Sequence, residues 1–215
     1  MCRAVMRMRP MRGGSIWIGI VMSLSRLRET GAPAQNTQLV RSLIEDVYNR
    51  TYGAAIREHY PDICFRADNA GGIVAAAGIR RASEEALFLE QYLDAPIEEV
   101  IRRHTDESVS RSEIVEIGNL VSNQTGQCRS FFKLLCAELH GLGFRYATAT
   151  ATRPLRRIFR CSGFDSRFLA FADPARLPDA GTHWGSYYAA DPHVVFGNVM
   201  DFQASLERRR QEGSR

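Results

Sequence analysis

The stretch Ile114–Phe144, IVEIGNLVSNQTGQCRSFFKLLCAELHGLGF, decides the fold of this chain. It opens with a mostly apolar, β-branched run that ends at Val121, which predicts a strand. Polar turn formers follow at 122–126. Apolar residues then recur at helical spacing until Gly141 and Gly143, which end the predicted helix. The stretch therefore predicts a strand that enters a helix through a short polar turn.

This turn is a candidate seat for an anion. The first backbone N–H groups of a helix have no partner within it, and the helix dipole favours negative charge there. Gln124, Thr125 and Gly126 form the turn, and Arg129 lies in the first helical turn, where it can contact phosphate. An ordinary capped helix with a solvated arginine is the alternative, and this stretch alone leaves both open.

The composition is that of an ordinary globular protein with basic ends. Of 215 residues, 45% are hydrophobic and 24% are charged. The net charge is +4, with +5 in residues 1–35 and +1 in residues 201–215, which leaves −2 for residues 36–200. A slightly acidic body does not suggest nucleic acid as a partner. The five cysteines lack metal-ligand spacing, so we expect reduced thiols and no metal.

The N-terminal residues carry a basic segment followed by the apolar run Ile16–Met22. This order resembles a signal peptide, but no small-x-small cleavage site follows. The run is shorter than the roughly 20 residues that span a membrane. We interpret residues 1–35 as a disordered or mis-assigned extension with the true start at Met22. We expect a cytoplasmic chain without stable membrane insertion; a real export signal and secretion are the alternative.

Apolar periodicity predicts the other elements, and their order is that of an α/β protein. Helices are expected from Asn36 or Thr37 to about Gly53, from Pro96, and over 155–161; strands are expected over 63–67, 73–79, 146–151, 168–171 and 194–196. After Asp201 the charged tail is expected to be a frayed helix. We predict one domain over 36–200, with a mixed, mostly antiparallel central sheet flanked by helices.

Four segments resemble the thermostable hemolysin family of bacteria: Ala82–Leu93, Glu116–Leu120, Thr150–Arg153 and His183–Tyr188. The element order is similar to that of the GCN5-related N-acetyltransferases. In that fold the turn after the fourth strand holds the pyrophosphate of coenzyme A, and the turn of this chain has one glycine where that loop has two. The hemolysin family also resembles the acyl-homoserine-lactone synthases, whose central strand likewise begins with a glutamate.

The resemblance implies an acyl-CoA N-acyltransferase-like fold and transfer of an acyl group from a thioester to an amine. The donor is acyl-CoA or an acyl carrier protein, used as a co-substrate, and the acceptor is a small-molecule amine, with no cofactor held tightly. Lysis of red cells, which the family name implies, fits the residues poorly, because nothing resembles a pore-forming hairpin or a long amphipathic helix. The oligomeric state stays open.

Glu116 is the leading candidate for the catalytic base. It lies between Ile114 and Ile117 on the predicted central strand, and a charge in that setting needs an explanation. A partly buried carboxylate with a raised pKa can take the proton of an amine. The alternative is a carboxylate on the outer face of the sheet, or one paired to Arg80 or Arg153.

Glu90 is similarly isolated among Phe88, Leu89 and Tyr92. It can orient or deprotonate an amine, or it can simply receive an arginine, and the two interpretations are about even. Cys128 begins the helix after the turn, but no histidine lies nearby in sequence to activate it, so a covalent route is the weaker hypothesis.

Further polar residues are candidates for holding the donor. Asn119 can offer its amide to a carbonyl or pantetheine group, or it is a turn residue at the strand end. Backbone N–H groups around Val121 can polarise the thioester. Thr150 can line the acyl or pantetheine channel, although threonine also simply favours strands. Arg153, at the end of the same predicted strand, can bind an anion.

An aromatic segment is the candidate acceptor site. His183, Trp184 and Tyr187 can form one wall of an acceptor pocket, although such clusters are more often packing. The resemblance to the acyltransferase fold implies direct attack by an amine on a bound thioester, with a non-catalytic ligand-binding module or a secreted membrane-active hemolysin as alternatives.

Overall fold

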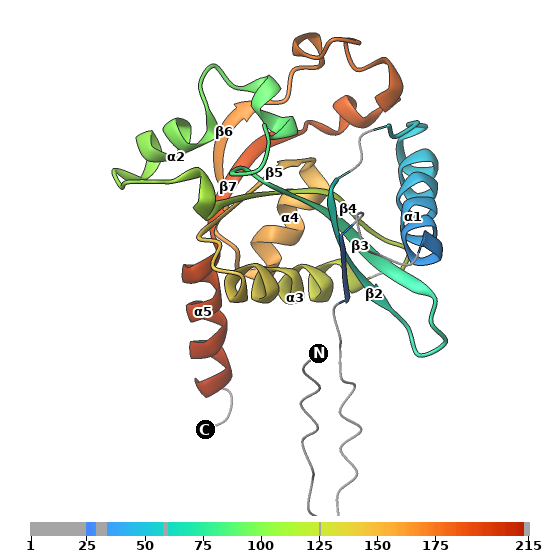
Figure 1. The fold of residues 1–215 in the computed structure, drawn as a ribbon, viewed down its shortest axis with the longest axis horizontal. Helices are drawn as coiled ribbons and strands as arrows, with labels where there is room; N and C mark the ends of the chain where they lie inside the picture. Colours follow the sequence, from blue (N-terminus) through green and yellow to red (C-terminus); the bar gives the residue numbers. More distant parts are fainter. Residues whose placement is uncertain (1–24, 29–33, 58–59, 125, 213–215) are drawn as a thin grey trace, which may run out of the picture.

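The computed structural model describes residues 25–28, 34–57, 60–124 and 126–212. These residues form one seven-stranded sheet with the order β1-β2-β3-β4-β5-β7-β6 (Figure 1). The strands are β1 (Ser25–Arg28), β2 (Asp62–Ala67), β3 (Ile73–Arg81), β4 (Ile114–Ser122), β5 (Tyr146–Ala151), β6 (Arg167–Phe171) and β7 (His193–Asn198). Only β4 and β5 are parallel neighbours; every other pair is antiparallel. The prediction of a mixed, mostly antiparallel sheet is confirmed.

Helices cover both faces of the sheet (Figure 1). They are α1 (Ala34–Tyr52), α2 (Ile97–Thr105), α3 (Gln127–Gly141), α4 (Arg153–Ser162) and α5 (Val199–Glu212), with short 3-10 turns η1 (Phe88–Tyr92), η2 (Arg111–Glu113), η3 (Pro174–Arg176), η4 (Thr182–Trp184) and η5 (Tyr187–Ala190). Helices α3, α4 and α5 share one apolar core with the sheet. On the opposite face α1 packs in a second core, and α2 packs with η1 in a third.

The run of alanines in β3 follows from this double coverage. Ala75 and Ala77 belong to the core under α3, whereas Ala76 belongs to the core under α1, and all three are fully buried. Helices on both sides leave room only for small side chains on that strand. The prediction that something packs closely on both faces of β3 is therefore correct.

The two parallel strands separate midway along their length. Glu116 pairs with Thr148, and this is the last of the three residue pairs that join β4 to β5, although β4 continues to Ser122 and β5 to Ala151. A bulge places an extra residue in β4, with Asn119 at a φ of 50°, a left-handed conformation that asparagine tolerates better than most residues. Beyond Glu116 the facing edges of the two strands are not paired with each other.

The structure differs from the sequence prediction at both ends. Ser25–Arg28, inside the predicted extension 1–35, forms the edge strand β1 and pairs with β2. The apolar run Ile16–Met22, including the predicted start, lies outside the described residues. At the other end, α5 is packed rather than frayed, since Phe202 and Leu206 are buried in the core with α3.

Candidate active site

Glu116 lies in the middle of the sheet, at the point where β4 and β5 begin to separate. Its side chain is 1% exposed and faces the side of the sheet that carries α1, α2 and η1, because it shares that face with Ile114. The amide of Phe88 donates to Oε2 at 2.8 Å, and the amide of Leu89 donates to Oε1 at 3.2 Å. The alternative that Glu116 is a carboxylate on the solvent-exposed face of the sheet is therefore excluded.

Tyr60 provides the third donor to Glu116. Its hydroxyl donates to Oε1 at 3.2 Å. The ring of Tyr60 lies against Gly78 and Gly118, which face each other across β3 and β4. A Cβ added at Gly118 would stand 2.0 Å from Cζ of Tyr60, and one at Gly78 would stand 2.5 Å from its Cγ. The two glycines therefore make the space that brings a tyrosine hydroxyl to the carboxyl group.

The surroundings raise the pKa of Glu116 from an ordinary value of 4.5 to about 7. Complete burial is the main cause, because it penalises the charged form. The amide of Phe88, the charge of Arg80 and the Tyr60 hydroxyl each lower the pKa again, but together they do not cancel the effect of burial. A carboxyl group with this pKa is close to half ionised at neutral pH, which suits a general base.

Arg80 is the charged neighbour that the sequence named as a possible partner of Glu116. It pairs with Glu116 across β3 and β4, so the two side chains lie on the same face of the sheet. Its guanidinium group lies 4.9 Å from the centroid of the Tyr60 ring and its Nε lies 3.6 Å from Oε1 of Glu85. Arg80 therefore acts on Glu116 as a nearby positive charge, while it also stacks on Tyr60.

A pocket of about 430 Å³ lies beside the residues that contact Glu116. Arg80 and Phe88 form part of its wall. His183 and Trp184 line the same pocket, as the sequence predicted for an acceptor site. Arg57 contributes a second, exposed guanidinium group. The aromatic segment thus both lines a pocket and packs, because the Trp184 ring also contacts the rings of Tyr48, Phe88, Tyr187 and Tyr188.

Tyr187 does not line this pocket. It is buried, and its hydroxyl donates to the carbonyl oxygen of Thr150 at 3.0 Å. Burial raises its pKa well above the ordinary range, so the hydroxyl stays protonated. For Tyr187 the packing alternative fits the contacts better than the role of a pocket wall.

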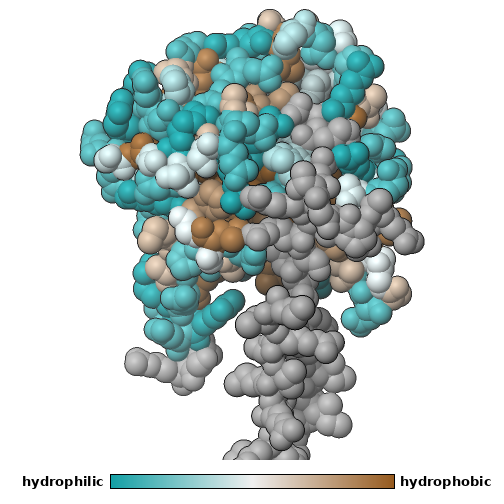
Figure 2. All heavy atoms as spheres, viewed as in Figure 1, coloured by the Kyte–Doolittle hydropathy of each residue, from teal (hydrophilic) through white to brown (hydrophobic). Residues whose placement is uncertain are grey.

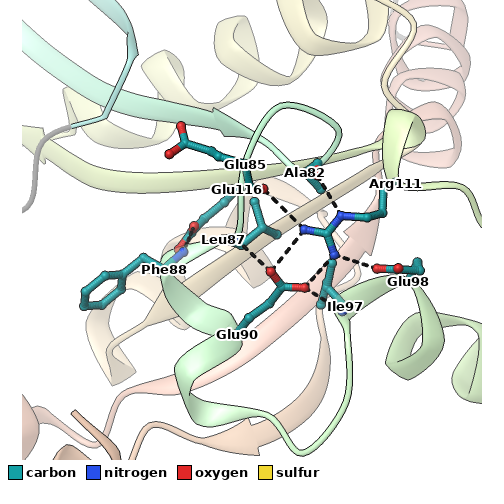
Figure 3. A network of polar contacts seen from close by, with 9 residues as sticks. All are labelled: Ala82, Glu85, Leu87, Phe88, Glu90, Ile97, Glu98, Arg111 and Glu116. Atoms are coloured by element: carbon teal, nitrogen blue, oxygen red, sulfur yellow. Dashed lines mark hydrogen bonds and ion pairs between the residues drawn. The ribbon is translucent and has the colours of Figure 1, made fainter. Parts of the chain in front are cut away.

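Glu90 has a different environment, shown in Figure 3. Arg111 binds both of its carboxylate oxygens, at 2.7 and 3.1 Å, and also binds Oε2 of Glu98 at 2.7 Å. The amides of Leu87 and Ile97 donate to Glu90 as well. Burial tends to raise the pKa of Glu90, but the hydrogen bonds from Arg111 and from the two amides outweigh it and leave the pKa below its ordinary value.

Glu90 is therefore the carboxylate that receives an arginine, the second of its two predicted roles. Arg111 completes the network by donating to the carbonyl oxygens of Ala82 and Glu85 (Figure 3). The network fixes the segment between β3 and α2, and that segment supplies the two amides that bind Glu116. Glu90 thus holds in place the segment whose amides bind Glu116.

The predicted anion seat lies at the N-terminus of α3. Gly126 precedes the helix with a φ of 81°, and no side chain of the described residues caps the helix there. Gln124 and Gly126 are exposed, and Thr125 lies outside the described residues. The side chain of Gln127 is used by the fold, because it accepts a hydrogen bond from Arg66 at 2.7 Å. The helix start is thus uncapped by any described side chain, as a seat for an anion requires.

The remaining predicted donor residues lie along the separating strands or at their ends. Asn119 is buried at the β4 bulge, and the Val121 side chain belongs to the core under α1, so only its backbone is available to a ligand. The hydroxyl group of Thr150 is buried without a hydrogen-bond partner among the described residues, on the part of β5 that no longer pairs with β4.

Arg129 and Arg153 are brought together although they lie on different helices. Both line a hollow of about 700 Å³ beside the first turns of α3 and α4. Arg153 is largely exposed and lies 3.6 Å from Oδ2 of Asp191. The acidic partner of Arg153 is Asp191, and the positive charge that acts on Glu116 is that of Arg80, so the alternative of a Glu116–Arg153 pair does not hold.

Sequence reasoning missed Tyr60, Gly78, Gly118 and Arg111. Each acts through a contact between segments far apart in the chain, as with Tyr60 and Glu116. The only local signal was the pair of glycines at the centre of predicted strands, which often marks close approach of another group.

Solved structures with a similar fold include two synthases and a protein named as an N-acetyltransferase. The AHL synthase LasI has a TM-score of 0.56 and 11% sequence identity, with 83% of this chain and 90% of that chain covered. FeeM, an N-acyl amino acid synthase from uncultured soil microbes, has a TM-score of 0.55 and 10% identity, with 86% and 95% covered. A protein from Lactobacillus plantarum with a provisional N-acetyltransferase assignment has a TM-score of 0.51 and 10% identity, with 82% and 99% covered. The chain therefore has the acyltransferase fold.

The thermostable hemolysin family model matches residues 31–202, so the chain belongs to that family. Both the suspected family and its fold are confirmed. A comparison with curated proteins finds no match.

Proposed function

We propose that this protein is an N-acyltransferase that moves an acyl group from a carrier-bound thioester to a small amine. The observation that carries the proposal is the buried Glu116 carboxyl group, whose pKa is raised to about 7 at the point where the two parallel strands open. A carboxyl group in this state can accept a proton and release it near neutral pH.

Glu116 retains room for one more hydrogen bond. Its two oxygens offer about four acceptor positions, and Tyr60, Phe88 and Leu89 occupy three. The remaining position receives the acceptor amine, directly or through one water. The neighbouring pocket with Arg80, His183 and Trp184 holds the rest of the acceptor.

The distance along β4 defines the kind of donor. Ser122, at the end of β4, lies about 20 Å along the strand from Glu116, at roughly 3.3 Å per residue, and the start of α3 follows beyond it. A donor bound at both places needs a long flexible arm that ends in a thioester. Coenzyme A and acyl carrier protein both carry such an arm. We place that arm between β4 and β5, past the unpaired hydroxyl of Thr150.

The proposed reaction is direct attack within a ternary complex. The amine nitrogen attacks the thioester carbonyl carbon, Glu116 takes the amine proton, and the C–S bond breaks as the amide forms. Backbone N–H groups near Val121, on the unpaired edge of β4, stabilise the developing oxyanion. The thiolate leaves on the carrier and takes up a proton, so that a free thiol is released for each amide formed.

A thiol-release assay tests this proposal. Purified protein is supplied with acyl-CoA and acyl carrier protein thioesters and with a panel of small amines, including amino acids. We expect thiol release that depends on an amine and is lost in Glu116→Gln. No release with any donor and amine, under conditions in which the protein is folded, would contradict the proposal.

The reaction suits a reducing compartment, and we propose that the protein acts in the cytoplasm. The four cysteines of the described residues are all free thiols. Free thiols at these four described cysteines agree with a compartment that also supplies the thioesters.

Membrane lysis is the second candidate, favoured only by the name of the family. Among the described residues, no helix has the length and apolar character to cross a bilayer. The face of the molecule in Figure 2 is mainly hydrophilic, with apolar residues in small separate areas. Red-cell lysis by wild-type protein and by Glu116→Gln separates the two candidates, because lysis that is equal in both would be independent of the acyltransferase site.

A further inference from the structure

The pocket beside the residues that contact Glu116 is built by four segments that lie far apart in the chain. They are the residues that follow α1, strand β3, the residues before and within η1, and the residues before and within η4. The amide of Ala55 donates to the carbonyl oxygen of His183 at 2.8 Å, which joins the first of these segments to the last. The volume of about 430 Å³ falls within the roughly 300–1,000 Å³ of small-molecule sites. The pocket therefore has the size for a small acceptor, between walls that the fold holds together.

Positive charge enters this pocket from two of the four segments. Arg80 comes from β3 and is buried, whereas Arg57 comes from the residues after α1 and is exposed. Arg57 makes no ion pair with any residue that the structure describes. Among the described lining residues Asp179 is the only acid, and its Oδ2 lies 3.9 Å from Nε2 of His183. With two guanidinium groups and one carboxylate, the lining favours a ligand that carries an anionic group.

The positions of Arg80 and Glu116 define how far apart the two polar groups of the acceptor lie. The two residues are directly opposite each other on β3 and β4, with their side chains on the same face of the sheet. The Cβ atoms of such a pair are about 4.5–5.5 Å apart. An amine at Glu116 and an anionic group at Arg80 are therefore close neighbours within the acceptor. An α-amino acid has this arrangement, because a single carbon atom joins its amine to its carboxylate.

We infer that the acceptor is an α-amino acid with an apolar side chain, and that Arg57 and Arg80 bind its carboxylate. The inference rests on the proposed function and names the acceptor class for the same site. A guanidinium group binds a carboxylate through two parallel hydrogen bonds, which fixes the direction of the amine as well as its place. The apolar part of the lining includes Leu177, Pro178 and Trp184, and it receives the side chain of the amino acid.

The kinetic test compares acceptors that differ only in the carboxylate: L-phenylalanine and L-leucine, their amides, and the amines phenethylamine and isopentylamine. The variant is Arg57→Ala, and Arg50→Ala, at an exposed position on α1, is the matched control. We expect Arg57→Ala to raise KM for the amino acids about 10- to 100-fold, as for lost charged hydrogen bonds, with KM for the amides and amines unchanged. Arg57→Lys should recover part of the loss, because it keeps the charge. An unchanged KM for the amino acids, or an equal rise for all three kinds of acceptor, would overturn the inference.

Binding of L-phenylalanine and L-leucine, measured by calorimetry with and without coenzyme A, separates this inference from the proposed function. We expect the wild type and Arg50→Ala to bind at least one of them, and Arg57→Ala to bind it at least about tenfold more weakly. If an amino acid binds in this way but no thiol release occurs, the amino-acid site stands and the acyltransferase proposal fails. If thiol release occurs with the amides and amines as readily as with the amino acids, the function stands and the acceptor class is wrong. Binding of neither amino acid to the wild type would also overturn the inference.

Discussion

Two glutamates bind backbone amides of one short segment, residues 87–97, and their surroundings leave them in opposite states. Glu90 accepts the amides of Leu87 and Ile97 and is bound by Arg111 on both oxygens, which lowers its pKa. Glu116 accepts the next two amides, those of Phe88 and Leu89, but it is completely buried and its pKa rises to about 7. One carboxyl group is kept ionised and the other can gain and lose a proton.

The contrast shows that hydrogen bonds from backbone amides do not by themselves set the state of a carboxyl group. Both glutamates accept two amides, and they differ in the guanidinium group and in solvent exposure. A bidentate arginine stabilises the charged form, whereas burial without one favours the neutral form. The same residue type therefore serves as a structural anchor in one place and as a candidate base in the other.

The largest expected effect is on the rate of acyl transfer. Glu116→Gln keeps the shape of the side chain and removes the base, so we expect kcat/KM to fall about 10²- to 10⁴-fold, the usual contribution of general base catalysis. Glu90→Gln, the matched change, should keep the rate within about tenfold of wild type because Glu90 does not contact the reacting atoms. Equal losses in the two variants would remove the distinction between them.

The next effect is on stability as a function of pH. Between pH 4.5 and about 7 the Glu116 carboxyl group is ionised in the unfolded chain but still protonated in the folded one, so the folded state binds more protons and its stability falls as pH rises. Relative to Glu116→Gln, we expect wild type to lose about 3 kcal/mol of unfolding free energy across this range. Urea unfolding of both proteins at several pH values measures the difference. If the difference in unfolding free energy between wild type and Glu116→Gln did not change with pH, Glu116 would not be buried in an uncharged form.

Loss of the ion pair between Arg111 and Glu90 is expected to lower the unfolding free energy by less than this change with pH. Arg111→Ala leaves Glu90 without its partner in a mostly buried place, and we expect it to lower the unfolding free energy by about 2–3 kcal/mol. Arg103→Ala removes an exposed arginine that pairs with Glu99, so it should change the unfolding free energy by no more than about 0.5 kcal/mol. A stable Arg111→Ala protein would show that the network does not hold the segment above Glu116.

The smallest of these effects concerns the space for Tyr60. Gly118→Ala pushes a methyl group into the ring, and we expect it to destabilise the fold by about 1–3 kcal/mol and to displace the hydroxyl from Glu116. Gly141→Ala, in an open place at the end of α3, should be neutral or stabilising by up to about 1 kcal/mol. Thermal unfolding of the two variants checks this, and equal behaviour would contradict the close packing of Tyr60.

Much of the fold follows from local patterns in the chain. The strand–turn–helix of β4 and α3 was predicted because its apolar spacing changes from strand-like to helical at a polar turn. Strand β1 was missed because its four residues, two of them arginines, carry no apolar pattern. Helix α5 was predicted as frayed because its charged residues outnumber the few, such as Phe202, that reach the core.

The site was predictable only in part, because contacts between residues far apart in the chain decide which glutamate is buried without an arginine. Glu116 could be found because a charge among β-branched residues is costly unless it is used. Glu90 gave the same local signal. The two differ in the position of Arg111 and in their burial, and neither can be read from the residues around Glu90 in the sequence. Tyr60 reaches Glu116 from 56 positions away in the chain, and such a contact depends on the register of β3 against β4.

The most direct test of the central claim is the titration of the Glu116 side chain itself. Carbon-13 NMR of the labelled carboxyl group, assigned by comparison with Glu116→Gln, follows its ionisation in the folded protein. We predict a pKa of about 7, while Glu90 titrates below its ordinary range. A Glu116 pKa at or below 4.5 would contradict the account, because the group would then be a permanently charged structural carboxylate like its neighbour.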